Sequence, residues 1–178
     1  MNIIDKAREH AFKAHEAVNH LYNGEPYKVH LIMAQVAAHN FAYLIPEEDI
    51  DDVVAGVLEH DTIEDCGVVY ADLKKATNER VAELVYACTN EKGRTRAERA
   101  NDKYYEGIRN TKYATFVKLC DRIANVLYSL EVKNKMIEMY KKEHKHFKSM
   151  LYSVEYDDMW KYLDGILTLE DDVNKYNI

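Results

Sequence analysis

The chain has 178 residues, of which 47% are hydrophobic and 31% are charged, so it can form one domain with a sizeable core. Its 31 acidic and 24 basic residues give a formal net charge of −7. That charge argues against a general nucleic-acid-binding protein, which would present a basic face. No apolar stretch reaches the ~20 residues of a membrane-spanning helix, and the N-terminus lacks a signal-peptide core. We therefore expect a cytoplasmic protein.

The sequence predicts an all-α fold that forms a single helical bundle over residues 1–178. There are only 6 glycines and 2 prolines, so turns are few, and apolar residues recur at helical spacing over long segments. The predicted helices cover residues 2–19, 26–41, 46–66, 70–76, 78–88, 96–109, 113–130, 132–152 and 155–172. Asn23 and Gly24 predict a turn before the second helix, Asn78 a helix cap, and Gly67 the end of the third helix.

Two details of these helices matter for the site. In the second helix we expect a broad apolar face, made by Val29, Ile32, Met33, Val36, Ala37 and Phe41. The helix over residues 96–109 is very polar and shows no continuous apolar face, so we expect it to be exposed or to line a polar cleft.

The three cysteines, Cys66, Cys88 and Cys120, are widely spaced and form no Cys-x-x-Cys pair. A zinc site made of thiolates is therefore not expected, and free thiols are the preferred interpretation.

The run from Glu59 to Asp65 is the strongest sign of chemistry in the chain. His60 and Asp61 are adjacent and follow an apolar run over residues 53–58. An imidazole nitrogen and a carboxylate oxygen that reach one point suit a divalent transition metal. A charged helix end is the alternative interpretation, but buried carboxylates need a partner or a metal. If the helix continues, Glu64 and Asp65 lie one turn after His60 and Asp61, on the same face.

Two more residues are candidate ligands once the His-Asp pair is interpreted in this way. His30 lies on the helix before the pair, where a satisfied core histidine is the alternative. Asp121 lies within the apolar helix over residues 113–130, and an aspartate is almost never buried without a partner.

The order His30, His60-Asp61, Asp121 resembles the H…HD…D pattern of the HD-domain phosphohydrolases. Within that superfamily, the hydrolases of the alarmone (p)ppGpp have a motif similar to the run His60-Asp61-Thr62-Ile63-Glu64-Asp65. These are the hydrolase domain of Rel/SpoT proteins and the small alarmone hydrolases of the Mesh1 type. The motifs lie within about residues 7–130, and further helices fill residues 131–172.

The resemblance implies a reaction and its main participants. His30, His60, Asp61 and Asp121 would bind one divalent metal ion, Mn²⁺ by resemblance, although the same ligands suit Fe²⁺ or Zn²⁺. Glu64 and Asp65 would orient and deprotonate the attacking water, although Glu64 is alternatively a surface acid near a helix end. The reaction would remove pyrophosphate from the 3′ position of (p)ppGpp, giving GDP or GTP.

Basic residues before Asp121 are candidates for binding the substrate's phosphates. Arg96, Arg99 and Lys103 have the spacing i, i+3, i+7, so one helix face would present all three. The alternative is a solvated face with salt bridges to Glu98 and Asp102. By resemblance, three further residues are candidates for contacting the nucleotide: Arg122, Asn125 and Tyr27.

One departure from the family leaves other functions open. The alarmone hydrolases place a basic pair shortly before the Gly-x-Pro-Tyr turn, where an arginine packs on guanine. Here Asn19 and His20 stand in that segment, and the ring of His20 or Tyr22 would have to stack on the base instead. The alternatives are an HD nucleotidase or pyrophosphatase for another nucleotide, or a non-catalytic nucleotide-sensing protein. The expected partner is a small nucleotide rather than nucleic acid or membrane, and the sequence does not fix the oligomeric state.

Overall fold

The computed structural model describes residues 1–173, so residues 174–178 of the predicted single domain lie outside the described residues. The described chain is all-α, as predicted, apart from one short hairpin. The α-helices are α1 (Ile3–Ala17), α2 (Lys28–Asn40), α3 (Ile50–Glu59), α4 (Thr62–Cys66), α5 (Tyr70–Ala76), α6 (Glu79–Cys88), α7 (Arg96–Arg99), α8 (Asp102–Asn110), α9 (Ala114–Glu131), α10 (Met136–Leu151) and α11 (Asp157–Val173). The short elements are β1 (Leu21–Tyr22), β2 (Glu25–Pro26) and the 3₁₀ turns η1 (Ala42–Leu44), η2 (Glu47–Asp49) and η3 (Val154–Tyr156).

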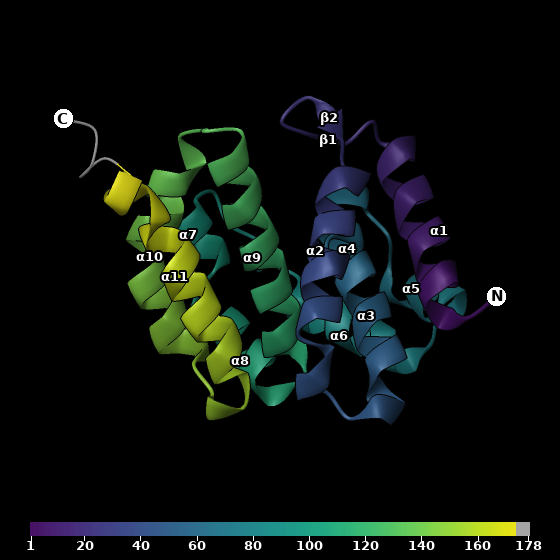
Figure 1. Cartoon of the computed structure of the whole chain (residues 1–178). Coiled ribbons are helices and arrows are strands. Elements are labelled where there is room, and N and C mark those ends of the chain that lie inside the picture. The colour runs from purple at the N-terminus through teal and green to yellow at the C-terminus, as the bar shows by residue number, and fades with distance from the viewer. Residues whose placement is uncertain (174–178) are drawn as a thin grey trace.

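Helix α9 lies in the middle of the molecule. In Figure 1, α1 to α6 lie on one side of it and α10 and α11 on the other. On the first side α9 packs against α2, α3 and α6, and on the second against α8, α10 and α11. Its buried residues, among them Phe116 and Ile123, share one core cluster with Trp160 and Leu163 of α11. A functional residue on α9 can therefore meet residues from both sides of the fold.

The turn before α2 is the predicted one, but Pro26 does not begin the helix. Asn23 and Gly24 have φ values of 53° and 90° and join β1 to β2, which pair antiparallel. Asparagine followed by glycine is the usual sequence of such a tight hairpin. Pro26 is the last residue of β2, so α2 begins only at Lys28.

The buried face of α2 differs from the predicted one. Ile32 and Val36 are 44% and 54% exposed, whereas the buried positions are His30, Leu31, Ala34, Ala37 and Ala38. Small alanine side chains let α2 lie close to both α3 and α9, which it contacts. The prediction chose the wrong face of α2 because it assigned large apolar residues to the core in preference to alanines.

The polar segment over residues 96–109 is two helices and not one. Ala100 leaves the helical conformation, and the Asn101 side chain caps α8 by accepting a hydrogen bond from the Tyr104 backbone N–H at 3.1 Å. Helix α8 buries Tyr104, Tyr105 and Ile108, so the expectation that this segment has no apolar face was wrong. Tyrosines supply that face, and their hydroxyl groups made the segment look polar.

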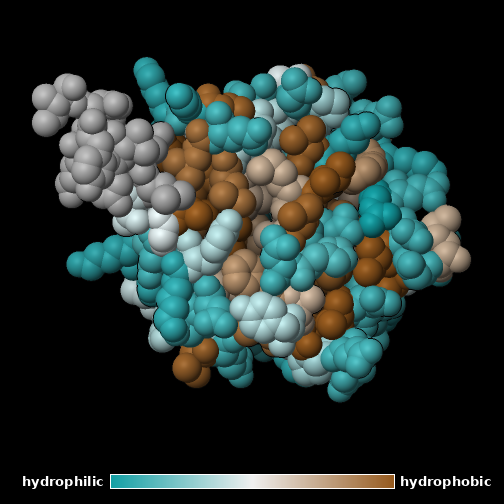
Figure 2. All heavy atoms as spheres, in the orientation of Figure 1, coloured by the Kyte–Doolittle hydropathy of each residue, from teal (hydrophilic) through white to brown (hydrophobic). Residues whose placement is uncertain are grey.

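The other local signals behave as predicted. Asn78 caps α6 by accepting a hydrogen bond from the Val81 backbone N–H at 2.9 Å, and Gly67 ends α4 with a φ of 69°. Cys66, Cys88 and Cys120 are free thiols. Among the described residues, no helix has the length and apolar character needed to cross a bilayer. On the face shown in Figure 2, apolar residues appear as separate groups among hydrophilic ones.

Candidate metal centre and adjoining pocket

Four side chains from three separate parts of the chain converge beside α9. His30 comes from α2, His60 and Asp61 from the junction of α3 and α4, and Asp121 from α9. One potential ligand atom from each lies within 4.8 Å of the others. The His30 and His60 Nε2 atoms are 3.3 Å apart, and Asp121 Oδ1 is 3.2 Å from His30 Nε2. Two imidazoles and two carboxylates at these distances could hold a transition-metal ion.

A break in the helix brings the His-Asp pair to one point. Helix α3 ends at Glu59 and α4 begins at Thr62, so the predicted continuous helix to Gly67 was wrong. On an uninterrupted α-helix, consecutive side chains diverge by about 100°. At the break, the Thr62 hydroxyl donates to the Glu59 carbonyl at 2.8 Å, and His60 Nε2 lies 2.8 Å from Asp61 Oδ2. The break therefore allows neighbouring residues to act at one point.

His60 is oriented by the backbone of its own helix. Its Nδ1 lies 2.7 Å from the Val57 carbonyl oxygen, which only an N–H can satisfy, so Nε2 faces the cluster. Burial opposes a charge on this imidazole, but the carboxylates of Asp61 and Asp121 outweigh burial and raise the pKa of His60 to about 10. The cluster is thus a place of negative potential that favours a cation, and its donor atoms fit a divalent metal.

Asp121 is held in place by two neighbours on α9. Lys118 Nζ donates to Asp121 Oδ2 at 2.7 Å, and Asn125 Nδ2 donates to Oδ1 at 2.6 Å. Burial would raise the pKa of Asp121, but Lys118 and His60 hold it well below its usual range. Tyr22 in turn donates to Asn125 Oδ1 at 2.8 Å. The predicted nucleotide-binding residue Asn125 is therefore engaged with a candidate metal ligand.

Tyr27 lies behind the cluster. It is 9% exposed, and its hydroxyl donates a hydrogen bond to Asp61 Oδ2. Its ring stacks on those of His20 and His15, with centroids 3.8 Å and 4.3 Å away. His20, considered above as a partner for the base, is thus packed on Tyr27, and its Nδ1 is 2.9 Å from His15 Nδ1. Nothing in the sequence distinguishes His15 from the other residues at helical spacing on α1.

Glu64 and Asp65 lie on α4, directly after the His-Asp pair, and both residues are exposed. Glu64 accepts hydrogen bonds from the Asn90 side chain at 2.9 Å and the Asn90 backbone N–H at 3.3 Å. Partial burial and the negative charges of Asp61 and Glu64 raise the pKa of Asp65 to about 7. Two carboxylates beside a candidate metal centre are suited to general acid–base chemistry.

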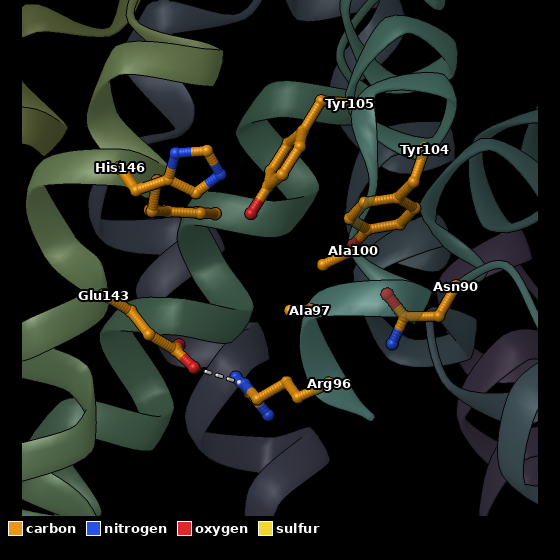
Figure 3. A pocket seen from close by; sticks show the side chains of 9 residues that line it. Asn90, Arg96, Ala97, Ala100, Tyr104, Tyr105, Glu143 and His146 are labelled. Carbon is orange, nitrogen blue, oxygen red and sulfur yellow. Dashed lines mark hydrogen bonds and ion pairs between the residues drawn. The ribbon is translucent and has the colours of Figure 1, made fainter. Parts of the chain in front are cut away.

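A cavity of about 220 Å³ adjoins Glu64 through Asn90. Figure 3 shows the rings of Tyr105 and His146 on one side of this cavity, and Arg96 joined to Glu143 on another. The lining residues are Asn90, Arg96, Ala97, Ala100, Tyr104, Tyr105, Glu143, His146 and Phe147. The cavity therefore combines aromatic rings with charged groups next to the candidate centre.

The predicted single face of Arg96, Arg99 and Lys103 is not formed, because the helix breaks between the second and third of these residues. Arg96 lines the cavity, and its Nε donates to Glu143 Oε1 at 2.6 Å. Arg99 is exposed on α7. Lys103 is 77% exposed and pairs with Glu91 at 2.8 Å, rather than with the acids of its own segment. Of the three, Arg96 has the geometry of a pocket residue.

Arg122 reaches the same group of charges from α9. Its Nη1 lies 3.1 Å from Glu143 Oε2, and its guanidinium carbon lies 4.4 Å from the Phe147 ring centroid and 4.9 Å from that of Tyr140. Arg122 was predicted from the sequence, whereas its partners Glu143, Tyr140 and Phe147 on α10 were not. Nothing in the mixed charges of that helix distinguishes Glu143 from its neighbours.

Comparison with known proteins finds similarity to a hydrolase. No protein-family model matches the chain. Guanosine-3′,5′-bis(diphosphate) 3′-pyrophosphohydrolase MESH1 of Danio rerio is 30% identical to it over 106 residues, which is 58% of this chain. The chain resembles the MESH1-type HD hydrolases. The matched region covers 55% of that protein, so this chain corresponds to about half of the length of MESH1.

Proposed function

We propose that this protein is a metal-dependent phosphohydrolase that removes pyrophosphate from the 3′ position of (p)ppGpp, giving GDP or GTP. The convergence of His30, His60, Asp61 and Asp121 carries this proposal. The similarity to MESH1, whose name describes this reaction, supports it.

In this proposal, the four converging residues bind one divalent ion. Imidazole and carboxylate together suit Mn²⁺, Fe²⁺ or Zn²⁺, and family resemblance favours Mn²⁺. When bound, such an ion stabilises charge on a phosphoryl oxygen as a Lewis acid and lowers the pKa of a coordinated water. Tyr27 and Asn125 act through the ligands: each holds one carboxylate in place, Asp61 and Asp121 respectively.

Glu64 and Asp65 orient the attacking water and accept its proton. The water oxygen adds to the phosphorus that carries the ribose O3′, the P–O3′ bond breaks, and O3′ takes up a proton as pyrophosphate leaves. Asn90, which lines the cavity, fixes the Glu64 carboxylate with two hydrogen bonds. Orienting a water in this way lowers the entropic part of the barrier.

The phosphates that are not cleaved are assigned to cations around the cavity. Arg96 and Arg122 carry guanidinium groups that match phosphate oxygens in pairs. Arg99 and Lys103 lie on the exposed surface nearby, where they would add positive potential rather than a fixed contact.

A second candidate is the hydrolysis of another nucleotide. Asn19 and His20 replace the basic pair of the alarmone hydrolases, and the His20 ring is already stacked on Tyr27 and lies 5.0 Å from the His15 ring. The family's arginine contact with guanine is therefore missing, and this weakens the assignment of the base more than that of the metal chemistry.

Product analysis of the purified chain with Mn²⁺ and ppGpp tests the proposal, with Asp61→Ala as the control. We expect pyrophosphate and GDP, and neither product from the control. Equal or faster turnover of ordinary nucleotides would replace the alarmone with another substrate. Tight binding of ppGpp without turnover, unchanged in Glu64→Ala, would indicate a nucleotide-sensing protein.

A further inference from the structure

Glu143 joins two arginines that come from different helices. Its Oε1 accepts from Arg96 of α7 at 2.6 Å, and its Oε2 lies 3.1 Å from Nη1 of Arg122 of α9. Glu143 itself comes from α10, which no motif in the sequence connects with the reaction. Each carboxylate oxygen thus satisfies one guanidinium, in the arrangement that an oxyanion of a ligand would adopt.

Arg122 does not depend on Glu143 for its position. Its side chain is 12% exposed, and its guanidinium packs on the rings of Phe147 and Tyr140. A planar cation held against aromatic rings keeps its orientation when its anion changes. Removing the charge of Glu143 should therefore leave a fixed cation packed against Phe147, a residue that lines the cavity.

Glu143 and Arg96 have room to separate. Their side chains are 30% and 50% exposed, and both line the cavity of Figure 3. An ion pair at such exposure is weak, because water screens it and both side chains lose freedom to form it. A ligand with a stronger anion could replace the carboxylate at modest cost.

We propose that the carboxylate of Glu143 occupies, in the free protein, an anion position that the diphosphate group of the substrate takes over. This inference rests on the proposed phosphohydrolase function. Displacement leaves two arginines for the ligand. A terminal phosphoryl group carries more negative charge than a carboxylate and offers three oxygens to the two guanidiniums, whereas a phosphodiester carries only one charge. Glu143 therefore determines specificity: it admits diphosphates and disfavours weaker anions.

Calorimetry of inorganic pyrophosphate binding to the metal-loaded full chain tests this. Glu143→Gln keeps the length of the side chain and removes its charge, so we expect binding to tighten about tenfold, the size of one charge-assisted contact. Glu138→Gln removes the same charge from an exposed position of the same helix, and should change binding by less than about twofold. Unchanged or weaker binding in Glu143→Gln would overturn the proposal, because Glu143 would then only hold Arg96 in place.

Two further measurements keep this result specific. Unchanged melting temperatures would show that the variants fold, and the gain should shrink in an Arg96→Ala background, because one of the two cations is gone. A full gain in that background would contradict the proposal. With the nucleotide substrate, KM should fall while kcat changes little. Pyrophosphate binding needs no turnover, so a protein that behaves as described but does not cleave ppGpp would reject the alarmone assignment alone.

Discussion

Two neighbouring residues of α9 belong to two different clusters of charge. Asp121 lies among the buried histidines, where its partners are His30, His60 and Lys118. Arg122 belongs to the half-exposed group with Glu143. The first cluster is recognisable from residue types, because a buried charge must have partners. The second is not, because exposed charges pair in many ways at little cost. Substitutions in the first cluster should therefore have larger effects on activity than substitutions in the second.

The largest effect should come from the buried cluster. Asp61→Ala removes one of four donors, so bound metal should be lost and hydrolysis should fall by at least about 1,000-fold, since Lewis-acid stabilisation supplies several kcal/mol. Elemental analysis of the purified protein and a ppGpp assay measure both quantities. Circular dichroism checks that the variant folds. Full metal content together with full activity would remove Asp61 from the site.

Glu64 should separate chemistry from metal binding. Glu64→Gln can still accept one of the two hydrogen bonds that Asn90 donates but cannot accept the proton of water, so kcat should fall by about 100-fold or more. Metal content should stay as in the unmodified protein. Glu47→Gln, an exposed acid on η2, is the matched control and should leave kcat unchanged. A variant of Glu64 with normal kcat would contradict its role.

The half-exposed cluster should show smaller effects, mainly on KM. Arg96→Ala should raise KM for ppGpp by about tenfold, because it removes a charge-assisted contact from the cavity. Lys103→Ala should change KM by less than about twofold, because Lys103 pairs with Glu91 at the surface. Steady-state kinetics of the two variants, side by side, measures the difference. Equal losses would mean that the surface charges act together as one field.

A third ionic group lies outside both clusters and should affect stability alone. Asp49 accepts hydrogen bonds from Tyr113, Arg80 and Lys112, which hold its pKa below its ordinary value of 3.8. A pKa depressed by folding stabilises the protein above the unfolded value, and this stabilisation is lost as the pH falls. Asp49→Asn should therefore melt below the unmodified protein at neutral pH, and the gap in melting temperature should narrow progressively as the pH falls below about 4. A constant gap down to about pH 3 would show that the charge is not the cause.

Much of the fold was predictable from spacing and caps, and the errors have physical causes. Asn78 and Gly67 act locally, so their sequence neighbours were enough to assign them. At Ala100 and His60, short-range contacts that compete with a continuous helix were overlooked: the Asn101 cap of α8 and the hydrogen bond from the Thr62 hydroxyl to the Glu59 carbonyl. Pro26 was likewise predicted to begin a helix, but it belongs to the β1–β2 hairpin, and α2 begins only at Lys28.

Some residues of the candidate site could be predicted from the sequence and others could not. His30 and Asp121 could be selected from the sequence because their residue types are unusual in apolar helices. Lys118, His15 and Glu143 could not, because their importance depends on partners that are distant in the chain or one helical turn away. Lys118 belongs to the motif around Asp121 but was given no role, since lysine stems are often buried while the amine reaches water.

Because α9 packs against helices on both of its sides, a fragment that ends after α9 should not fold as the full chain does. The motifs that resemble the HD hydrolases end near residue 130, but one face of α9 packs against α10 and α11. Trp160 and Phe147 on those helices are 0% and 3% exposed. A chain ended after α9 would leave its own half of that core in water, and such apolar surface favours aggregation. The reaction motifs and the independently folding unit therefore have different lengths, and α10 and α11 cannot be removed as an appendage.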